Sequence, residues 1–171
     1  MLQENNEYVE VYRLDENGNR YKTEEIAKRG KNVENGSYVI GVNNWIVNSK
    51  GEFLVQKRSM QKRNNPGKWS STNGLRAIGE ESIETCMRET NEELGIDISN
   101  CDINFIYSKI AGESLMVDIF LTKLDVDLNN ITIQKEEVDE IKWVSKEELL
   151  KLDISTTCQY IKKDIDKFLI Q

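Results

Sequence analysis

Residues 74–96 read GLRAIGEESIETCMRETNEELGI, and the interpretation of the whole chain starts from this stretch. Small and apolar side chains recur at helical spacing from Ser82 to Leu94, which predicts an α-helix over these residues. Gly95 follows directly, and glycine commonly follows the last turn of a helix because it adopts the left-handed conformation without strain. The sequence therefore predicts a helix over Ser82–Leu94 that ends at Gly95.

The predicted helix has two distinct faces when about 100° of rotation is assigned to each residue. One is a packing face made of Ile83, Cys86, Met87, Thr90 and Leu94. The second is a separate acidic face made of Glu89, Glu92 and Glu93. Like charges three and four residues apart repel each other, and near a helix C-terminus they also oppose the helix dipole. This cluster predicts either a solvated acidic surface or a group that a bound cation neutralises.

The composition of the chain narrows the chemistry that such a cluster can support. The 171 residues include no histidine, which excludes His-ligated zinc, Ser-His-Asp sites and Cys-His sites. Carboxylate oxygens without histidine favour Mg²⁺ or Mn²⁺ as the cation. The 23 Lys and Arg residues against 30 Asp and Glu residues give a net charge of −7, which argues against binding of a nucleic acid polymer. A locally basic phosphate pocket remains compatible with that charge.

The remaining sequence predicts an α+β fold built on a mixed or antiparallel sheet. Asn17-Gly18 is a strong hairpin signal between two apolar runs. The expected strands are Tyr8–Leu14, Arg20–Thr23, Tyr38–Val47, Phe53–Lys57, Asn104–Ile110, Leu115–Leu124 and Ile141–Val144. The expected helical segments are a turn at Glu24–Arg29, a helix over Lys146–Leu150 behind a Ser145–Glu148 capping box, and a C-terminal helix with a stripe of Ile161, Ile165, Phe168 and Leu169. Trp45 and Trp143 are expected in the core.

The length predicts one domain over residues 1–171, with an N-terminal hairpin extension at 1–35 and a core at 36–171. The hairpin is expected to serve either as a dimer element, giving a homodimer, or as an extra edge of the sheet. The three cysteines share no CxxC spacing and are expected to be free, buried thiols. No signal-like or membrane-spanning run is present, so we expect a cytoplasmic protein without membrane association.

The spacing within residues 74–96 resembles the Nudix box. The matching fixed positions are Gly74, Glu80, Arg88, Glu89, Glu92, Glu93, Gly95 and Ile96. Thr90 stands where an aliphatic residue is more usual. The likeness extends to the flanks and spans roughly Gly36–Leu150. The resemblance implies an α/β/α sandwich around a mixed β-sheet, and hydrolysis of a small-molecule diphosphate with Mg²⁺ or Mn²⁺.

Carried over by motif position, the resemblance implies a role for each motif residue. Glu89, Glu92 and Glu93 are expected to bind the metal, with Glu80 beside them as an outer ligand or as the partner of Arg88. Arg88 is expected to orient the carboxylates, since a guanidinium fixes the plane of a carboxylate. The backbone carbonyl of Gly74 is a further expected ligand. Glu89 and Glu92 are the first candidates for the general base, followed by Glu136 and Glu137, for which a plain acidic loop is the alternative.

A second group of residues, Gln56–Ser59 and Pro66–Trp69, resembles the Nudix subgroup related to isopentenyl-diphosphate isomerase. The resemblance implies that cations from this region approach the diphosphate. The candidate substrate-binding residues are Lys57, Arg58, Lys62 and Lys68, together with Glu137 from the later acidic loop. The alternative interpretation is a solvated basic loop.

Three functions are compatible with the sequence, in order from the most to the least favoured. The first is a metal-dependent hydrolase that cleaves the phosphoanhydride of a nucleoside diphosphate-linked or similar small diphosphate. The second is a regulatory module that binds a diphosphate without cleaving it, although such modules commonly lose box glutamates and this chain keeps all four. The isomerase itself is disfavoured because the chain has no histidine, and serine rather than cysteine follows Trp69.

Overall fold

The computed structural model describes residues 7–169, so residues 1–6 of the expected N-terminal extension and residues 170–171 lie outside the described part. The strands are β1 (Tyr8–Leu14), β2 (Arg20–Lys28), β3 (Ser37–Val47), β4 (Phe53–Arg58), β5 (Trp69–Ser70), β6 (Thr72–Leu75), β7 (Asp102–Ile110), β8 (Leu115–Lys123) and β9 (Val138–Val144). The helices are α1 (Ser82–Leu94), α2 (Lys146–Lys151) and α3 (Ile161–Asp164), with 3₁₀ turns at Leu128–Asn130, Thr156–Cys158 and Ile165–Phe168.

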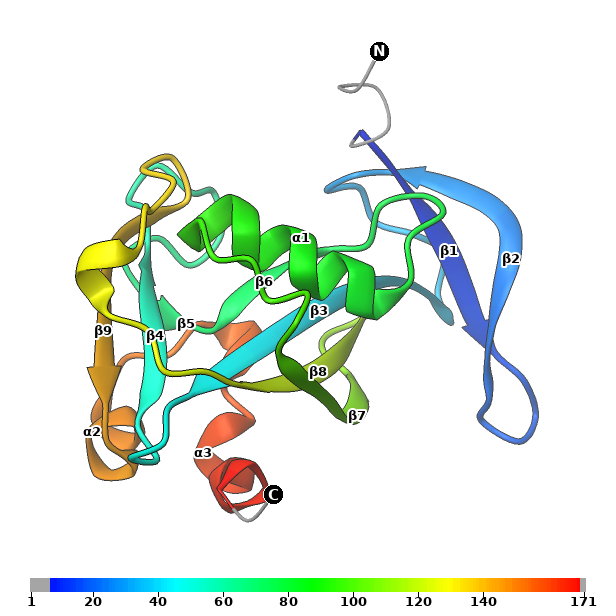
Figure 1. Ribbon diagram of the computed structural model, residues 1–171. Helices are drawn as coiled ribbons and strands as arrows, with labels where there is room; N and C mark the ends of the chain where they lie inside the picture. Colours follow the sequence, from blue (N-terminus) through cyan, green and yellow to red (C-terminus); the bar gives the residue numbers. More distant parts are fainter. Residues whose placement is uncertain (1–6, 170–171) are drawn as a thin grey trace.

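A mixed sheet forms the centre of the molecule (Figure 1). Strand β3 pairs in parallel with β8 and antiparallel with β1, β4 and β6. Helix α1 covers one face of the sheet, while α2 and α3 lie on the other (Figure 1). The expected α/β/α sandwich around a mixed sheet is therefore confirmed.

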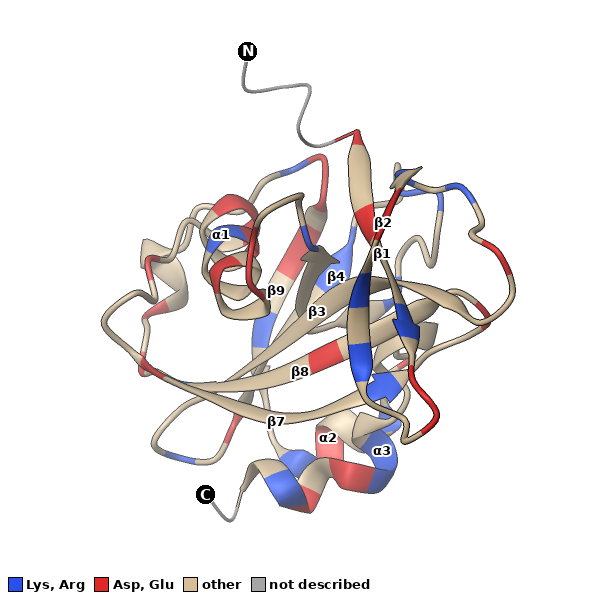
Figure 2. Ribbon diagram, turned by 90° about the vertical axis from the view of Figure 1, so that its right-hand side faces the viewer, with Lys and Arg blue, Asp and Glu red and all other residues tan. Residues whose placement is uncertain are grey.

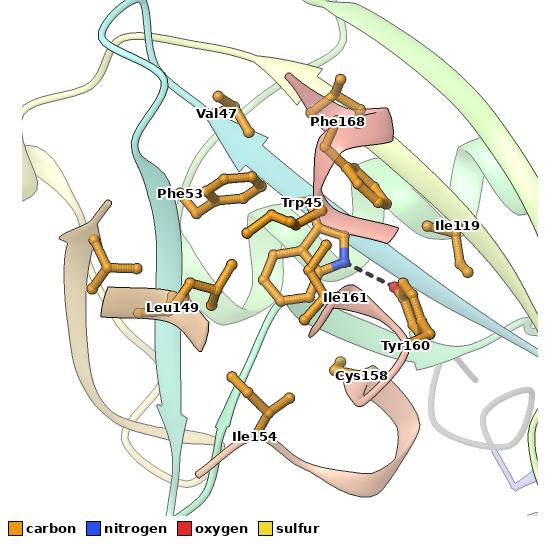
Figure 3. Packing of buried hydrophobic residues seen from close by; sticks show 14 of the residues in the cluster. Trp45, Val47, Phe53, Ile119, Leu149, Ile154, Cys158, Tyr160, Ile161 and Phe168 are labelled. Carbon is orange, nitrogen blue, oxygen red and sulfur yellow. Dashed lines mark hydrogen bonds between the residues drawn. The ribbon is translucent and has the colours of Figure 1, made fainter. Parts of the chain in front are cut away.

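The two layers of helices are packed by alternate residues of the same strands, as the period of two in a β-strand requires. Ile46 and Leu54 pack against Leu94 of α1. Their neighbours Trp45 and Phe53 face the opposite layer, in the cluster that holds the C-terminal helices. Figure 3 shows this second cluster around the indole of Trp45, whose Nε1 donates to the Tyr160 hydroxyl at 2.8 Å.

Trp45 is fully buried, which confirms its expected place in the core. Trp143 is half-buried and packs at the edge of the cluster under α1.

Two adjacent asparagines of β3 connect the sheet to both layers. The side-chain amide of Asn44 donates to Thr90 of α1 at 3.1 Å. The side-chain amide of Asn43 points the other way and donates to the Thr157 carbonyl and the Tyr160 hydroxyl, each at 3.1 Å. Both asparagines are buried, and their side-chain amides find partners on opposite sides of one strand.

The N-terminal hairpin forms as predicted, but its second strand is longer than expected. The predicted helical turn at Glu24–Arg29 is wrong, because β2 continues to Lys28 and pairs it with Tyr8. A short isolated turn would have left the backbone groups at the start of β1 without partners, whereas an extended strand satisfies them. Strand β1 then joins β3 through Tyr12 and Arg13, so the hairpin extends the sheet at one edge.

The bounds and both ends of α1 agree with the prediction. Glu81 caps the N-terminus in a reciprocal capping box with Glu84, and Gly95 ends the helix at φ 65°. The predicted packing face is wrong in one respect, because Ile83 is exposed while Thr85 is buried. Compared with the prediction, the face of α1 that packs on the sheet is shifted toward the side that carries the glutamates.

Two further expectations at the edges of the fold are corrected. The C-terminal helix is broken, since α3 ends at Asp164, a 3₁₀ turn follows, and Leu169 is exposed rather than part of a stripe. The short strands β5 and β6 were not predicted, and β6 brings residues 72–75 alongside β3. The capping box of Ser145 and Glu148 at the start of α2 is confirmed.

The cysteines are free, with Cys86 and Cys158 buried and Cys101 half-buried. Within residues 7–169, no helix has the length and apolar character needed to cross a membrane.

A buried carboxylate ties the hairpin to the core. Asp118 of β8 accepts two hydrogen bonds from the Arg20 guanidinium, at 2.7 and 3.0 Å, and further bonds from the Ser82 and Ser108 hydroxyls. Burial alone would raise the pKa of Asp118, but these bonds and the charge of Arg20 outweigh it and hold the pKa below its ordinary value.

Asp118→Asn is expected to lower the free energy of unfolding at pH 7 by about 2 kcal/mol, the typical worth of hydrogen bonds to a charged group. Because the folded-state pKa is depressed, the stability from the ionised carboxylate is present above the ordinary pKa of 3.8 and is lost as pH falls through the folded value. Urea unfolding of both proteins at pH 7 and pH 3 measures this. A difference that does not shrink at pH 3 would contradict the ionic explanation.

Candidate active site

Strand β6 places Gly74 directly against the acidic side of α1. Gly74 pairs with Val42 of β3, and its α-carbon faces the Glu89 side chain. An added Cβ would lie 1.9 Å from Oε1 of Glu89 and 2.0 Å from its carboxyl carbon. Glycine is therefore required here by the close approach of the Glu89 side chain.

Arg88 links the carboxylates of this region. Its guanidinium donates to both oxygens of Glu80, at 2.7 and 3.0 Å, to Oε1 of Glu89 at 2.9 Å and to Oε2 of Glu92 at 3.2 Å. It also donates to the Leu75 carbonyl at 3.2 Å. Basic and acidic positions accordingly lie side by side on α1 (Figure 2). The fork of Arg88 fixes the plane of the Glu80 carboxylate and holds one oxygen each of Glu89 and Glu92.

Glu80 is held from several sides, in the position expected of a partner of Arg88. Besides Arg88, it accepts hydrogen bonds from the Thr85 hydroxyl at 2.7 Å and from the Ala77 backbone amide at 3.2 Å. Burial by itself would raise the pKa of Glu80, but these donors lower it below the ordinary value. Glu80 is thus ionised at neutral pH.

The three remaining glutamates differ in environment. Residue exposure is 9% for Glu89 and 3% for Glu93, whereas the Glu92 side chain is 46% exposed. The predicted separate acidic face is therefore wrong for Glu89 and Glu93, which lie in the buried side of the helix.

Glu93 accepts a hydrogen bond from Gln56 Nε2 at 2.7 Å and one from the Asn73 amide at 3.3 Å. Burial, together with the nearby charge of Glu89, raises the pKa of Glu93 to about 8. Burial also raises the pKa of Glu89, against the opposing influence of Arg88.

The donor set agrees in chemistry with a hard divalent cation. Three carboxylates lie within two turns of one helix, and two of them are buried. The pKa values of these two are raised because burial disfavours the ionised carboxylate, and a bound cation would offset that cost. Within residues 7–169 no three Asp, Glu, Cys or His side chains already converge as a metal-binding group. Arg88 is instead the cation that bridges Glu89 and Glu92.

A cleft of about 510 Å³ borders this cluster on the other side of β6. Its lining combines amides, hydroxyls and aliphatic side chains with two cations and one acid. The lining residues are Gly30, Lys31, Asn32, Val39, Gly41, Val42, Asn43, Arg58, Asn64, Asn65, Asn73, Gly74, Leu75, Glu113, Ser114, Leu115, Val117 and Thr157. Gly74 thus faces the cleft and touches Glu89, and it joins the two regions.

The structure separates the residues predicted to bind substrate. Arg58 lines the cleft and donates to Asn73 Oδ1 at 3.3 Å. Lys57 is not among the lining residues, and its ammonium lies 5.9 Å from the centre of the Trp69 ring. Lys68 pairs with Asp153 at 2.8 Å.

Glu137 forms an ion pair with Lys62, and its backbone carbonyl accepts from the Ser59 amide. This pair lies between the basic loop and the later acidic loop. Neither residue belongs to the lining of the described cleft. Glu136 is exposed.

Sequence reasoning missed several residues that surround the carboxylates. Gln56 stands beside the basic pair Lys57-Arg58, and the β4 alternation would have placed it on the face of α1. Asn73 and Leu75 act through the backbone amide and the backbone carbonyl, which a side-chain motif does not reveal. Arg29 comes from the hairpin and donates to the same Leu75 carbonyl at 3.3 Å, a contact between distant segments.

The NUDIX domain family matches residues 37–161. An uncharacterized Nudix hydrolase of Listeria innocua is 38% identical over 136 residues, covering 78% of this chain and 79% of the relative. An isopentenyl-diphosphate Delta-isomerase of Dinoroseobacter shibae is 33% identical over 106 residues, covering 57% and 59%. The crystal structure of DR0079 from Deinococcus radiodurans shares the fold with a TM-score of 0.73 at 18% identity, covering 95% of this chain and 99% of that one.

Gly74→Ala is expected to displace Glu89, because the added methyl overlaps its carboxyl group. The clash should lower the free energy of unfolding by about 1–3 kcal/mol, as overpacking does. Adding Glu89→Ala removes the three atoms that clash, so the double variant should recover the stability lost by Gly74→Ala relative to Glu89→Ala alone. Thermal unfolding of the four proteins measures this. Equal losses from Gly74→Ala in both backgrounds would contradict the proposed contact.

Glu93→Gln is expected to stabilise the protein at alkaline pH in the presence of a chelator. Between the ordinary pKa of 4.5 and the folded value of about 8, the folded state holds a proton that the unfolded state has released. The free energy of unfolding of the wild type therefore falls as pH rises through this window, and the glutamine variant lacks that loss. Urea unfolding at pH 5 and pH 8.5 tests this, and a pH-independent difference between the two proteins would refute it.

Proposed function

The chain belongs to the Nudix family, and on that premise we propose that it is a Mg²⁺- or Mn²⁺-dependent hydrolase. Its proposed reaction is cleavage of the phosphoanhydride in a nucleoside diphosphate-linked or similar small diphosphate. The observation that carries this proposal is the pair of buried glutamates, Glu89 and Glu93, beside Gly74 and an open cleft.

We assign the metal to the carboxylates of Glu89, Glu92 and Glu93, with the Gly74 carbonyl as a further ligand and Glu80 outside them. When bound, a divalent cation neutralises phosphate oxygens and lowers the pKa of a water molecule. The buried glutamates support this assignment because their raised pKa values mark a site where positive charge is favourable.

The protein groups have separate tasks in the proposed reaction. Arg88, anchored on both oxygens of Glu80, donates to one oxygen each of Glu89 and Glu92 and so orients these two carboxylates. Glu92 is half-exposed and Glu89 is buried, so the two offer a solvent-accessible and a shielded carboxylate as proton acceptor for the attacking water. We place the general base at one of these two residues.

The cleft supplies the groups for the organic part of the substrate. Five asparagines lie in its lining: Asn32, Asn43, Asn64, Asn65 and Asn73. The side-chain amides of three of them, Asn43, Asn65 and Asn73, are hydrogen-bonded within the protein. Arg58 adds a guanidinium at the wall shared with Asn73. Apolar side chains, among them Val39, Leu75 and Leu115, share the lining, so the cleft offers both polar and apolar contacts to the group attached to the diphosphate.

The residues present also bear on the two alternative functions, the isomerase and the diphosphate-binding module without catalysis. The isomerase relative aligns with 57% of this chain, yet this chain has no histidine and has Ser70 after Trp69. A diphosphate-binding module without catalysis would leave the four motif glutamates with no reaction to support.

The proposed activity is tested with a panel of nucleotide sugars, ADP-ribose, dinucleotides, oxidised nucleotides and prenyl diphosphates in Mn²⁺. Release of phosphate after coupling to a phosphatase reports cleavage. Glu92→Gln is expected to reduce kcat by about 10²–10⁴-fold, the usual range for loss of a general base. The fold should persist, since Glu92 is half-exposed.

Glu84→Gln is the matched control on the same helix. Glutamine at this position also completes a capping box, so α1 and the activity should be unchanged. Equal activity of Glu92→Gln and the wild type would contradict the assignment of Glu92. Tight binding of a nucleotide sugar without turnover across the panel would favour the regulatory module instead.

A further inference from the structure

One wall of the cleft comes from outside the residues that match the family. Gly30, Lys31 and Asn32 line it, whereas the match begins at residue 37. They follow β2 directly, at the end of the N-terminal hairpin. The hairpin therefore reaches the site as well as extending the sheet.

Arg29, the first residue after β2, contacts the motif itself. Its Nη2 donates to the Leu75 carbonyl at 3.3 Å, and the same carbonyl accepts from Arg88 Nη2 at 3.2 Å. Arg29 is exposed, so its guanidinium retains donors for an anion.

The segment is held in place by its own backbone. The Arg29 amide donates to the Glu7 carbonyl at 2.8 Å, and the Lys31 amide donates to the Lys28 carbonyl at 3.0 Å. Gly30 between them has φ +78°, a conformation that side chains rarely adopt and that sharpens the turn. Lys31 is exposed and lines the cleft, on the wall formed by the hairpin.

The charges of this wall suit an anion next to the carboxylates. Lys31 and Arg58 are the cations among the lining residues, Glu113 is the acid, and Arg29 adds a third positive charge beside Gly74 and Leu75. A diphosphate is anionic, and it would bind close to three glutamates whose charge a single metal ion does not fully offset. Cations on the wall of the cleft therefore lower the electrostatic cost of its binding.

We propose that residues 29–32 form a substrate-binding arm in which Arg29 and Lys31 bind the phosphate oxygens of the diphosphate. This inference rests on the proposed function and adds to it a specific role for the N-terminal hairpin. Arg29 and Lys31 are substrate-binding residues in this scheme, and proton transfer stays with the motif glutamates.

The test compares Arg29→Gln, Lys31→Gln and the double variant with the wild type. Two quantities are measured: the Kd for α,β-methylene-ADP with Mn²⁺, by calorimetry, and KM and kcat for the best substrate of the panel. Each single variant is expected to raise Kd and KM about tenfold, the effect of losing one charge-assisted hydrogen bond. The kcat should change less than KM.

Two controls separate binding from structure. Lys28→Gln removes a neighbouring cation that pairs with Glu7 at 2.8 Å on the outside of the hairpin, and it should leave Kd unchanged. Arg29→Lys keeps the charge and should recover part of the affinity. Thermal midpoints of all variants should stay close to that of the wild type, because both side chains are exposed.

An unchanged Kd and KM in the double variant would overturn the inference while leaving the hydrolase proposal intact. The inference also fails if Lys28→Gln weakens binding as much as Arg29→Gln, since the effect would then be on hairpin structure or overall charge. If the wild type cleaves no diphosphate but its affinity for the probe depends on Arg29 and Lys31, the hydrolase proposal fails and the arm stands.

Discussion

The structure of the site depends on the burial of two glutamate side chains against a sheet. A carboxylate loses hydration when it is buried, and proteins accept this cost where donors or cations are at hand. Arg88 supplies the cation for Glu89, and Gln56 with the Asn73 amide supplies donors for Glu93. Gly74 makes the arrangement sterically feasible, since any larger residue would overlap Glu89. This close contact joins β6, α1 and the cleft at one point.

The parts of the fold that the sequence predicted are those set by local rules. The bounds of α1 were predicted correctly because apolar helical spacing and a glycine at C′ are short-range features of the chain. The hairpin signal at Asn17-Gly18 and the β-branched and aromatic composition of β3 are local in the same sense. The extent of β2 was missed because its partner groups lie at the start of β1, some twenty residues away in sequence. The C-terminal helix was predicted from a regular apolar stripe, but packing against the core divides it after Asp164.

The candidate site shows the same division between local and tertiary information. Motif spacing identified Gly74, Glu80, Arg88 and the three glutamates. The structure gathers Glu80, Glu89 and Glu92 around the Arg88 guanidinium, while Glu93 is held by Gln56 and the Asn73 amide. Helical geometry alone placed Glu89 and Glu93 on a separate acidic face, because a helical wheel does not show which side a sheet will cover. Lys57 and Lys68 were grouped with Arg58 by charge, whereas in the structure Lys57 lies over the Trp69 ring, Lys68 pairs with Asp153, and neither lines the cleft. Asn73 and Arg29 reach the site through tertiary contacts that no linear pattern contains.

The two neighbouring asparagines of β3 affect both the unfolding of the protein and the choice of positions that can be mutated. Asn44 is bound to α1 and Asn43 to the C-terminal segment, so separating either layer exposes a buried amide in the same strand. Amide protons of β3 should therefore exchange with solvent only on global unfolding. Residues 30–32 and 64–65, which contribute cleft wall from loops, lie outside this locked centre. Laboratory evolution of ligand preference is best directed at Lys31, Asn32 and Asn64 in those loops, where new side chains leave the buried centre of the sheet undisturbed.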